Sequence, residues 1–232
     1  MTKRMVEYWV IPPEKNAEFV AGMEEVLETY AMAYDPEKPV VCMDEQPVQL
    51  ILETKEPIAA TTGHPQRVDY EYERNGTASI FMFAEPLSGF RQATARARRT
   101  KEDWALEVAS LLDTRYAEHD KITLVMDNLN THTKGAFYTA FEPDVARAYI
   151  KRIDFLYTPK HGSWLNIAEC ELSCMSSQCL ADRRIGHLAE LQSEIDAWAT
   201  QTNEKHRAVD WQFTIDNART KLKRLCPKFK TG

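Results

Sequence analysis

The chain has 232 residues, of which 44% are apolar and 28% are charged, a composition typical of soluble globular proteins. It is too apolar for a disordered chain, and no stretch approaches the roughly 18–20 uninterrupted apolar residues of a membrane span, which excludes an integral membrane protein. The net charge of −6 argues against a protein dedicated wholly to nucleic acid, because such proteins are usually basic.

The start of the chain and its cysteines both indicate a protein of the cytoplasm. Glu7 stands where a secretory signal peptide needs its apolar core. The five cysteines are an odd number without paired C-x-x-C spacing, which argues against a disulfide framework and against a structural zinc site. We therefore expect a cytoplasmic protein with no membrane association.

The first part of the chain predicts a helix followed by strands. After a polar start, an apolar run at residues 8–11 and two prolines, apolar residues recur every three or four positions, as in an amphipathic helix. A short apolar run then ends on Asp44, and a longer segment alternates around Asn75-Gly76, a pair that favours the tight turn of a hairpin. The expected elements are a helix over 14–31, a buried strand over 40–43, and a hairpin over 68–89 whose second arm, 78–84, is a central strand.

The second part of the chain alternates helices with strands. One apolar strand ends on Asp127, Pro143 interrupts a helical stretch, and Ser163 is expected to cap the helix that follows. The expected elements are a helix from 101 to 119, a strand over 122–126, a helical stretch over 137–150, a strand over 153–157, and helices over 163–179, 188–202 and 212–225.

This order of elements predicts an α/β fold. Three strands, followed by helix, strand, helix, strand and helix, imply a mixed sheet with helices packed on its faces. We expect three parts along the chain: a linker and N-terminal helix at residues 1–36, a core domain at 37–185, and a C-terminal helical extension at 186–232.

Two basic stretches contrast with the acidic total. Residues 91–101 carry five positive charges and no acid, and residues 219–230 carry six, again without an acid. Each stretch is either a solvated face of a surface element or a surface that binds phosphates. The sequence leaves both interpretations open.

Two aspartates follow apolar strands and could form a metal site. Ligand sites in open sheets lie where strands end, so Asp44 and Asp127 could be close in space. Two nearby carboxylates repel each other, and a divalent cation would relieve that repulsion. Mg²⁺ prefers carboxylate oxygens and needs few protein ligands. The alternative is that each aspartate only caps the turn after its strand.

A third acid lies on the helix that follows the last strand. Glu169 and Glu171 stand on opposite borders of the apolar stripe of that helix. Periodicity alone therefore does not choose between these two carboxylates.

The blocks VVCMDEQP, LVMDNLNTH and YTPKHGSWLNIAECE contain Asp44, Asp127 and Glu169 in this order. Together they resemble the catalytic core of the DDE transposases of bacterial insertion sequences in the mariner superfamily. In that family the second aspartate lies in a D-N-x-x-x-H block, matched here by Asp127, Asn128 and His132. The third acid follows the Trp of an S-W-L-N-x-x-E block by five residues, which selects Glu169.

The resemblance implies a ribonuclease H-like fold, with residues 37–185 as the DDE catalytic domain. Asp44, Asp127 and Glu169 would be the catalytic residues and would hold two Mg²⁺ ions, with Mn²⁺ as a substitute. The implied reaction is metal-dependent cleavage of DNA strands followed by strand transfer. Two alternatives remain: an idle DNA-binding remnant that keeps the fold, and a nuclease of the same fold that cuts without joining.

The resemblance also implies partners and supporting residues. The partners would be DNA, both the transposon ends and a target that is usually TA, and a second copy of the chain in a homodimer associated with the bacterial nucleoid. Full-length family members carry N-terminal helix-turn-helix modules, which this chain is expected to lack. Asn128 and Asn166, beside the acids in sequence, are expected to hold them by hydrogen bonds. His132 is expected either to orient a metal-bound water or contact a phosphate, or to cap the start of the next helix. The residues expected to contact DNA are Arg91, Arg96, Arg98, Arg99, Lys101, Lys160 and His161.

Overall fold

The computed structural model describes residues 16–225, so the apolar run at 8–11, the two prolines after it and the last lysines of the second basic stretch lie outside the described residues. In chain order the helices and strands are α1 (Ala17–Ala31), β1 (Val40–Glu53), β2 (Tyr72–Glu85), β3 (Phe90–Arg96), α2 (Lys101–Thr114), β4 (Ile122–Met126), α3 (Lys134–Ala140), α4 (Pro143–Lys151), β5 (Ile153–Tyr157), α5 (Ile167–Met175), α6 (Leu188–Asn203) and α7 (Ile215–Lys221).

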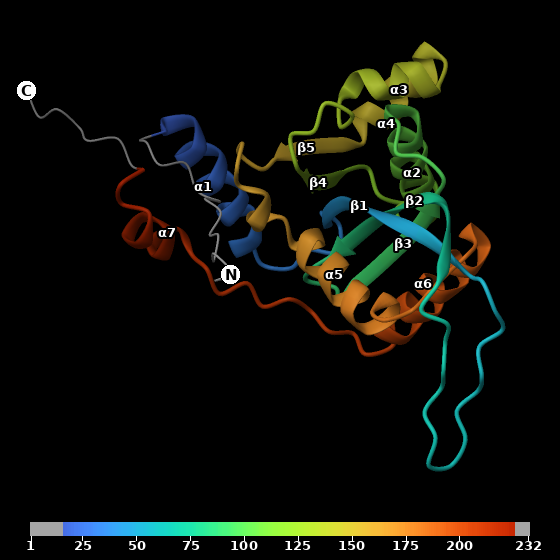
Figure 1. Ribbon diagram of the computed structural model, residues 1–232. Helices are drawn as coiled ribbons and strands as arrows, with labels where there is room; N and C mark the ends of the chain where they lie inside the picture. Colours follow the sequence, from blue (N-terminus) through green and yellow to red (C-terminus); the bar gives the residue numbers. More distant parts are fainter. Residues whose placement is uncertain (1–15, 226–232) are drawn as a thin grey trace, which may run out of the picture.

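The strands form one five-stranded sheet in the order β3-β2-β1-β4-β5 (Figure 1). The pairs β1–β2 and β2–β3 are antiparallel, whereas β1–β4 and β4–β5 are parallel. The predicted mixed sheet is therefore confirmed. The parallel half is the half in which helices intervene between strands, as parallel connections require.

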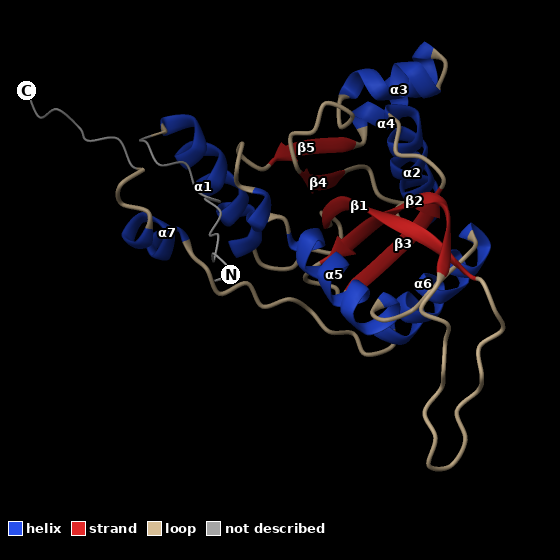
Figure 2. Cartoon of the chain, in the orientation of Figure 1, coloured by secondary structure: helices blue, strands red, loops and turns tan. Residues whose placement is uncertain are grey.

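Helices cover both faces of the sheet because its strands are apolar on both sides (Figure 2). Along β1, Cys42 packs toward α1, α5 and α6, whereas its neighbours Val41 and Met43 pack toward α2, α3 and α4. The same alternation with a period of two residues runs through β2 and β4. The result is three layers with two hydrophobic cores, one on each side of the sheet.

The strands differ from the sequence-based expectation in three places, and the first is β1. It does not end before Asp44 but continues to Glu53, because β2 supplies an antiparallel partner along this whole length. Only the parallel pairing with β4 stops early, at Cys42 with Val125. Asp44 thus lies where β1 stops pairing with β4, although β1 itself continues.

The predicted hairpin turn at Asn75-Gly76 is wrong. Strand β2 passes straight through these residues, and the register with β1 shifts between Gln49 and Ile51, which marks a bulge. Gly76 has a φ of +79°, a value that a bulge uses as readily as a hairpin turn does. The turn lies instead between β2 and β3, where Gly89 has a φ of +74° and its Cα approaches the main chain of residues 206–207 too closely for any side chain.

Strand β3 was not predicted, because polar residues conceal its alternation. Every second residue of Phe90–Arg96 is buried, but the first of these inward positions is an arginine. The two other inward positions are Ala93 and Ala95, whose small side chains give a weak apolar signal.

Each predicted helix is present, but three have clearly different bounds. The helix expected over 101–119 ends at Thr114, the one expected over 212–225 spans Ile215–Lys221, and the one expected from Ser163 begins later. Pro143 divides the stretch between β4 and β5 into α3 and α4, and it occupies the first turn of α4, where a missing N–H costs nothing. Before α5, Ser163 begins a short 3₁₀ turn (Ser163–Leu165), and Asn166 rather than Ser163 caps the helix. A π-helical turn, Ser176–Leu180, follows α5 directly.

Residues 54–71 connect β1 with β2 through a long loop that extends away from the sheet (Figure 1). Within the described residues, no helix combines the length and the apolar character that crossing a membrane would require.

Candidate active site

Asp44 and Asp127 lie at the same level on neighbouring strands. Each stands two residues beyond the last parallel pair of β1 and β4, which is Cys42 with Val125. Both members of that pair pack on the α5 side of the sheet, so the two aspartates, two residues on, are directed to the same side. The sequence-based expectation that these acids come together is met by the strand order.

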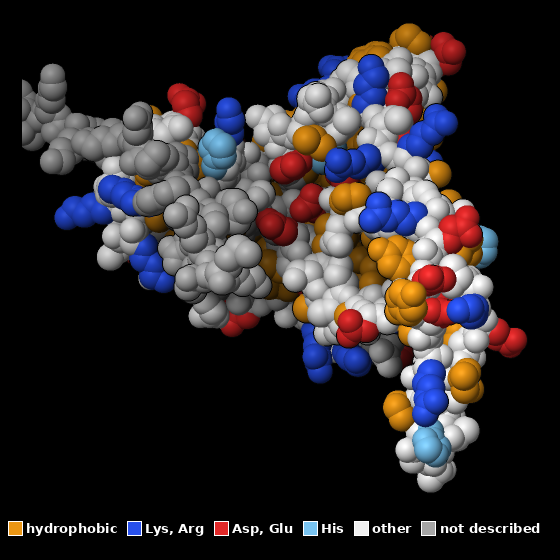
Figure 3. All heavy atoms as spheres, viewed as in Figure 1, with side chains coloured by type: hydrophobic (Ala, Val, Ile, Leu, Met, Phe, Trp, Pro, Cys, Tyr) orange, Lys and Arg blue, Asp and Glu red, His pale blue; other side chains and the backbone are white. Residues whose placement is uncertain are grey.

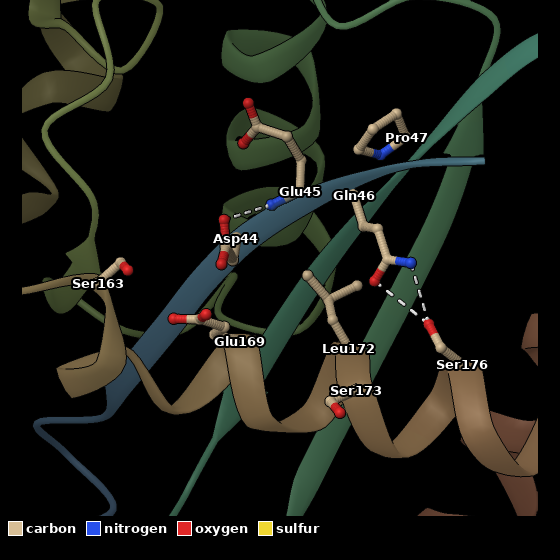
Figure 4. A pocket seen from close by; sticks show the side chains of 9 residues that line it. All are labelled: Asp44, Glu45, Gln46, Pro47, Ser163, Glu169, Leu172, Ser173 and Ser176. Carbon is tan, nitrogen blue, oxygen red and sulfur yellow. Dashed lines mark hydrogen bonds between the residues drawn. The ribbon is translucent and has the colours of Figure 1, made fainter. Parts of the chain in front are cut away.

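Glu169 reaches the same place from the first turn of α5. Asp44 and Glu169 line one cleft, and Figure 4 shows their carboxylates directed into a common space from β1 and from α5. Asp127 lines a second hollow beside this cleft, and Ser163 lines both. The three acids therefore surround two adjoining depressions on one surface.

The environment of Asp44 is that of a carboxylate crowded by other acids. Burial raises the pKa of Asp44 to about 7, and the negative charges of Asp127, Glu45 and Glu169 act in the same direction. A hydrogen bond of 2.8 Å from the Glu45 main-chain N–H opposes this rise. Repulsion of this kind is what a bound cation would remove.

Glu171 is excluded from this cleft by a different partner. It is buried and forms a bidentate ion pair with Arg91, whose Nε and Nη2 lie 3.0 and 2.7 Å from its two oxygens. The structure thus separates the two glutamates that periodicity left equivalent. Glu169 is exposed on the side of the acids, and Glu171 is neutralised in the interior.

Asn166 connects the strand of Asp44 with the helix of Glu169. Its side chain is fully buried; its amide nitrogen donates to the Met43 carbonyl at 2.8 Å, and its oxygen accepts from the Ala168 N–H at 3.2 Å. One side chain therefore ties the residue before Asp44 to the N-terminus of α5. This is the geometry expected of a residue that orients both acids.

His132 joins Asp127 to a carboxylate that sequence analysis did not select. Its Nδ1 lies 2.7 Å from Asp127 Oδ1, and its Nε2 lies 2.8 Å from Glu45 Oε2. Burial alone would lower the pKa of His132, but its contacts with Asp127 and Glu45 outweigh burial and raise it to about 9. A protonated imidazole, stacked on Trp104, thus stands between two carboxylates.

Glu45 follows Asp44 directly, and alternation along β1 directs it to the opposite side of the strand, as Figure 4 shows. The available signal in the sequence was the pair of adjacent acids, but nothing local indicated that the second of them faces a histidine 87 residues away.

The hollow that contains Asp127 also holds three of the expected polar residues. Asn128, Lys160 and His161 line it together with Pro159 and its neighbour Thr158. All three are at least partly exposed, and His161 has a φ of +66°, an uncommon value for a residue other than glycine. Lys160 and His161 therefore stand in the same hollow as Asp127.

The basic stretch at 91–101 divides into a buried and an exposed half. Arg91 is 5% exposed, and besides Glu171 its Nη1 donates to the carbonyls of Gly89 and Arg207, both at 2.7 Å. The expectation that Arg91 contacts DNA is therefore wrong, because no part of its guanidinium is available to a phosphate.

Arg96 is also engaged, in ion pairs with Glu107 and, at 3.5 Å, with Asp103 of α2. Its side chain is only 31% exposed, so the structure does not support a direct contact with DNA. Arg98, Arg99 and Lys101 remain exposed in the turn between β3 and α2 and at the start of that helix. In Figure 3, acidic side chains gather in a hollow near the middle of the visible face, with Lys and Arg side chains beside it.

The acids suit a hard divalent cation in kind. All three are carboxylates, the donors that Mg²⁺ and Mn²⁺ prefer. Asp127 Oδ1 is buried without a well-directed hydrogen bond, although it lies close to His132. Among residues 16–225, no three His, Cys, Asp or Glu side chains already converge closely enough to enclose one ion. The donor set still fits such a cation in chemical kind.

Comparison with known families agrees with this arrangement. The sequence profile of the DDE superfamily endonuclease family matches residues 39–192, which include all three acids. The chain belongs to the DDE superfamily endonucleases. No curated protein matches it in sequence.

Solved structures of a mariner transposase share the fold of this DDE family member. The chain in the Mos1 strand transfer complex superposes with a TM-score of 0.60 at 13% identity, covering 99% of this chain and 68% of that one. The catalytic domain of Mos1 mariner transposase gives 0.56 at 12% identity, covering 95% of this chain and all of that domain. The Mos1 mariner paired end complex with Mn gives 0.58 at 15% identity, covering 97% of this chain. This chain spans 66% of the length of that last relative. The expected ribonuclease H-like fold is confirmed.

Proposed function

We propose that this chain is the catalytic domain of a DNA transposase that cleaves DNA strands and transfers their ends to a target. The observation that carries the proposal is that Asp44 and Glu169 line one cleft while Asp127 lines the hollow beside it, so that one surface presents all three acids. Phosphodiester displacement brings two negative reactants together, and clustered cations are the physical means of doing so. A nuclease that cuts without joining would use the same acids.

In this proposal the three carboxylates hold two Mg²⁺ or Mn²⁺ ions. When bound there, such a pair would supply Lewis-acid assistance to the attacking and leaving oxygens of an in-line displacement. The use of these metals is supported by structural relatives solved as Mos1 paired end complexes with Mg and with Mn.

The remaining residues of the site orient the acids and receive DNA. Asn166 sets Glu169 relative to Asp44, and His132, itself fixed by Glu45, sets the direction of Asp127. Asn128, Lys160 and His161 line the hollow beside Asp127 and contact the incoming backbone. Arg98, Arg99 and Lys101 bind phosphates farther away, without reading sequence.

DNA as the partner is supported by a relative described as a paired-end complex with the left transposon end. The motifs point to the bacterial insertion sequences of the mariner superfamily. From this resemblance we further propose a TA target, a homodimer that handles both element ends, and action at the nucleoid in the bacterial cytoplasm.

The test is a cleavage and joining assay on DNA, combined with calorimetry of Mn²⁺ binding. Asp44→Ala, Asp127→Ala and Glu169→Ala should each abolish metal binding, and Asp127→Asn should abolish Mg²⁺-dependent cleavage while folding and nonspecific DNA binding persist. Full activity of Asp127→Asn would refute the assignment. Cleaved but never joined products from the parent chain would favour the nuclease.

A further inference from the structure

The cleft that holds Asp44 and Glu169 continues beyond these acids. It has a volume of about 490 Å³, and its far end is formed by Gln46 and Pro47 of β1 and by Leu172, Ser173 and Ser176 along α5 and the turn after it (Figure 4). We call Gln46, Ser173 and Ser176 the neutral end of the cleft, because all three side chains are polar and uncharged.

The neutral end and the acids share the same two surfaces. Gln46 lies two residues after Asp44, on the same side of β1, and Ser173 and Ser176 lie four and seven residues after Glu169, on the same side of the helix. Seven residues of helix rise about 10 Å. The neutral end is therefore a subsite next to the acids, and it extends away from them along the helix to Ser176.

The chemistry of the neutral end does not suit a phosphate. Among the described residues that line the cleft there is no Lys, Arg or His. A phosphate at the neutral end would find no fixed cation and would lie close to the carboxylates of the same cleft. Hydroxyl and carboxamide groups instead match the uncharged donors and acceptors of nucleobase edges and sugars, and Leu172 and Pro47 add apolar surface for the same groups.

The polar groups of the neutral end are already arranged. The Gln46 carboxamide nitrogen lies 3.1 Å from Ser176 Oγ, and the Ser176 hydroxyl lies 3.2 Å from the Gln46 oxygen. The helix changes to π-helical geometry at Ser176, a local irregularity that is frequent at functional sites. Gln46 is held half-buried at the cleft wall by this partner.

We propose that the neutral end binds the nucleoside adjacent to the phosphate that reacts at the acids, through its base and sugar. The volume of the cleft lies within the range of small-ligand sites. The inference rests on the proposed function, because the acids must hold the reacting phosphate for its neighbour to arrive here. It assigns to this part of the cleft a preference for strands that carry bases, which the acids alone cannot have.

The experiment compares two short fluorescein-labelled strands by anisotropy in the presence of Mn²⁺. One is single-stranded DNA, the other has the same number of phosphates on abasic tetrahydrofuran units, and both carry phosphorothioate linkages to resist cleavage. The parent chain should bind the strand with bases more tightly. Gln46→Ala and Ser176→Ala should each weaken binding of that strand by about three- to ten-fold, the loss of one or two neutral hydrogen bonds, and leave the abasic strand unchanged.

Ser177→Ala is the matched control, because Ser177 is exposed, donates to the Cys174 carbonyl and does not line the cleft. Thermal unfolding of each variant separates lost binding from lost fold. Equal, Mn²⁺-dependent binding of both strands by the parent would overturn the subsite and leave the proposed function standing. Absence of any Mn²⁺-dependent binding by the parent would overturn the proposed function itself. Retention of the preference in both variants would also overturn the subsite.

Discussion

Glu169 and Glu171 stand two residues apart on α5, yet their surroundings are opposite. Glu171 is buried against a fixed guanidinium from β3, whereas Glu169 is exposed beside two further acids and has no cation among the described residues around the cleft. The comparison shows that the partner decides the role of a carboxylate. A carboxylate neutralised by the fold holds the helix in place, whereas the one left uncompensated is the one that we propose as a metal ligand.

The largest expected effect comes from breaking the buried pair. Arg91→Ala leaves Glu171 charged and unpaired in the interior, so the free energy of unfolding should fall by about 3–5 kcal/mol. Urea titration measures this loss. The double variant Arg91→Ala, Glu171→Ala should lose less than the two single variants together, because no charge is stranded. A loss below about 1 kcal/mol in Arg91→Ala would contradict the structural role.

Glu169→Gln should leave the stability of the fold unchanged and weaken metal binding. Because Glu169 is exposed, the free energy of unfolding should stay within about 0.5 kcal/mol of the parent value. Mn²⁺ affinity measured by calorimetry should fall by more than about 100-fold, since changes to residues that merely support metal ligands already cost about 10- to 100-fold. Glu18→Gln, an exposed change on α1, is the control. Loss of metal binding in Glu171→Gln but not in Glu169→Gln would show that Glu171, not Glu169, is the metal ligand.

The metal-free protein should lose stability as the pH rises. Asp44 has a folded pKa of about 7 against an ordinary 3.8, so the folded state keeps a proton that the unfolded state has released, and stability falls across this window. His132 has a folded pKa of about 9 against 6.5, so its contribution is complete below 6.5 and is lost as the pH rises through 9.

Urea titrations across both windows measure this decline. Mg²⁺ should counteract it, because the ion binds the ionised acids of the folded state only. Asp44→Asn should remove the loss of stability between about pH 3.8 and 7, and His132→Asn should remove the loss between about pH 6.5 and 9. If the free energy of unfolding of the metal-free parent rises with pH across these two ranges, the raised pKa values of Asp44 and His132 are wrong.

The smallest effect concerns the exposed half of the basic stretch. Changing Arg98 and Arg99 together to Ala should weaken DNA binding a few-fold and reduce the slope of log affinity against log salt by about 0.9 for each phosphate that is no longer neutralised. Arg147→Ala with Lys151→Ala, on the exposed side of α4, makes the same change in net charge and serves as the control. An unchanged slope would show that these arginines are only solvated.

Much of the fold was predictable because helical and strand periodicity are local. The two strands that lead to Asp44 and Asp127, the division of a helix at Pro143 and the order of elements all follow from neighbours in sequence. The wrong predictions concern segments whose structure depends on pairing with a residue or strand far away in the sequence. Asn75-Gly76 favours a tight turn, but β1 offers a long partner, so β2 continues and Gly76 becomes part of a bulge.

By itself, the sequence determined where most strands and helices form, that the sheet is mixed, and which motifs carry the acids. The motif already selected Glu169. Only the tertiary structure decided that Glu171 pairs with an interior Arg91, and that Glu45 contacts His132 beside Asp127. The physical reason is the same in each case. Backbone preferences act within a few residues, whereas the electrostatic partner of a charged side chain comes from a remote element that only folding brings near.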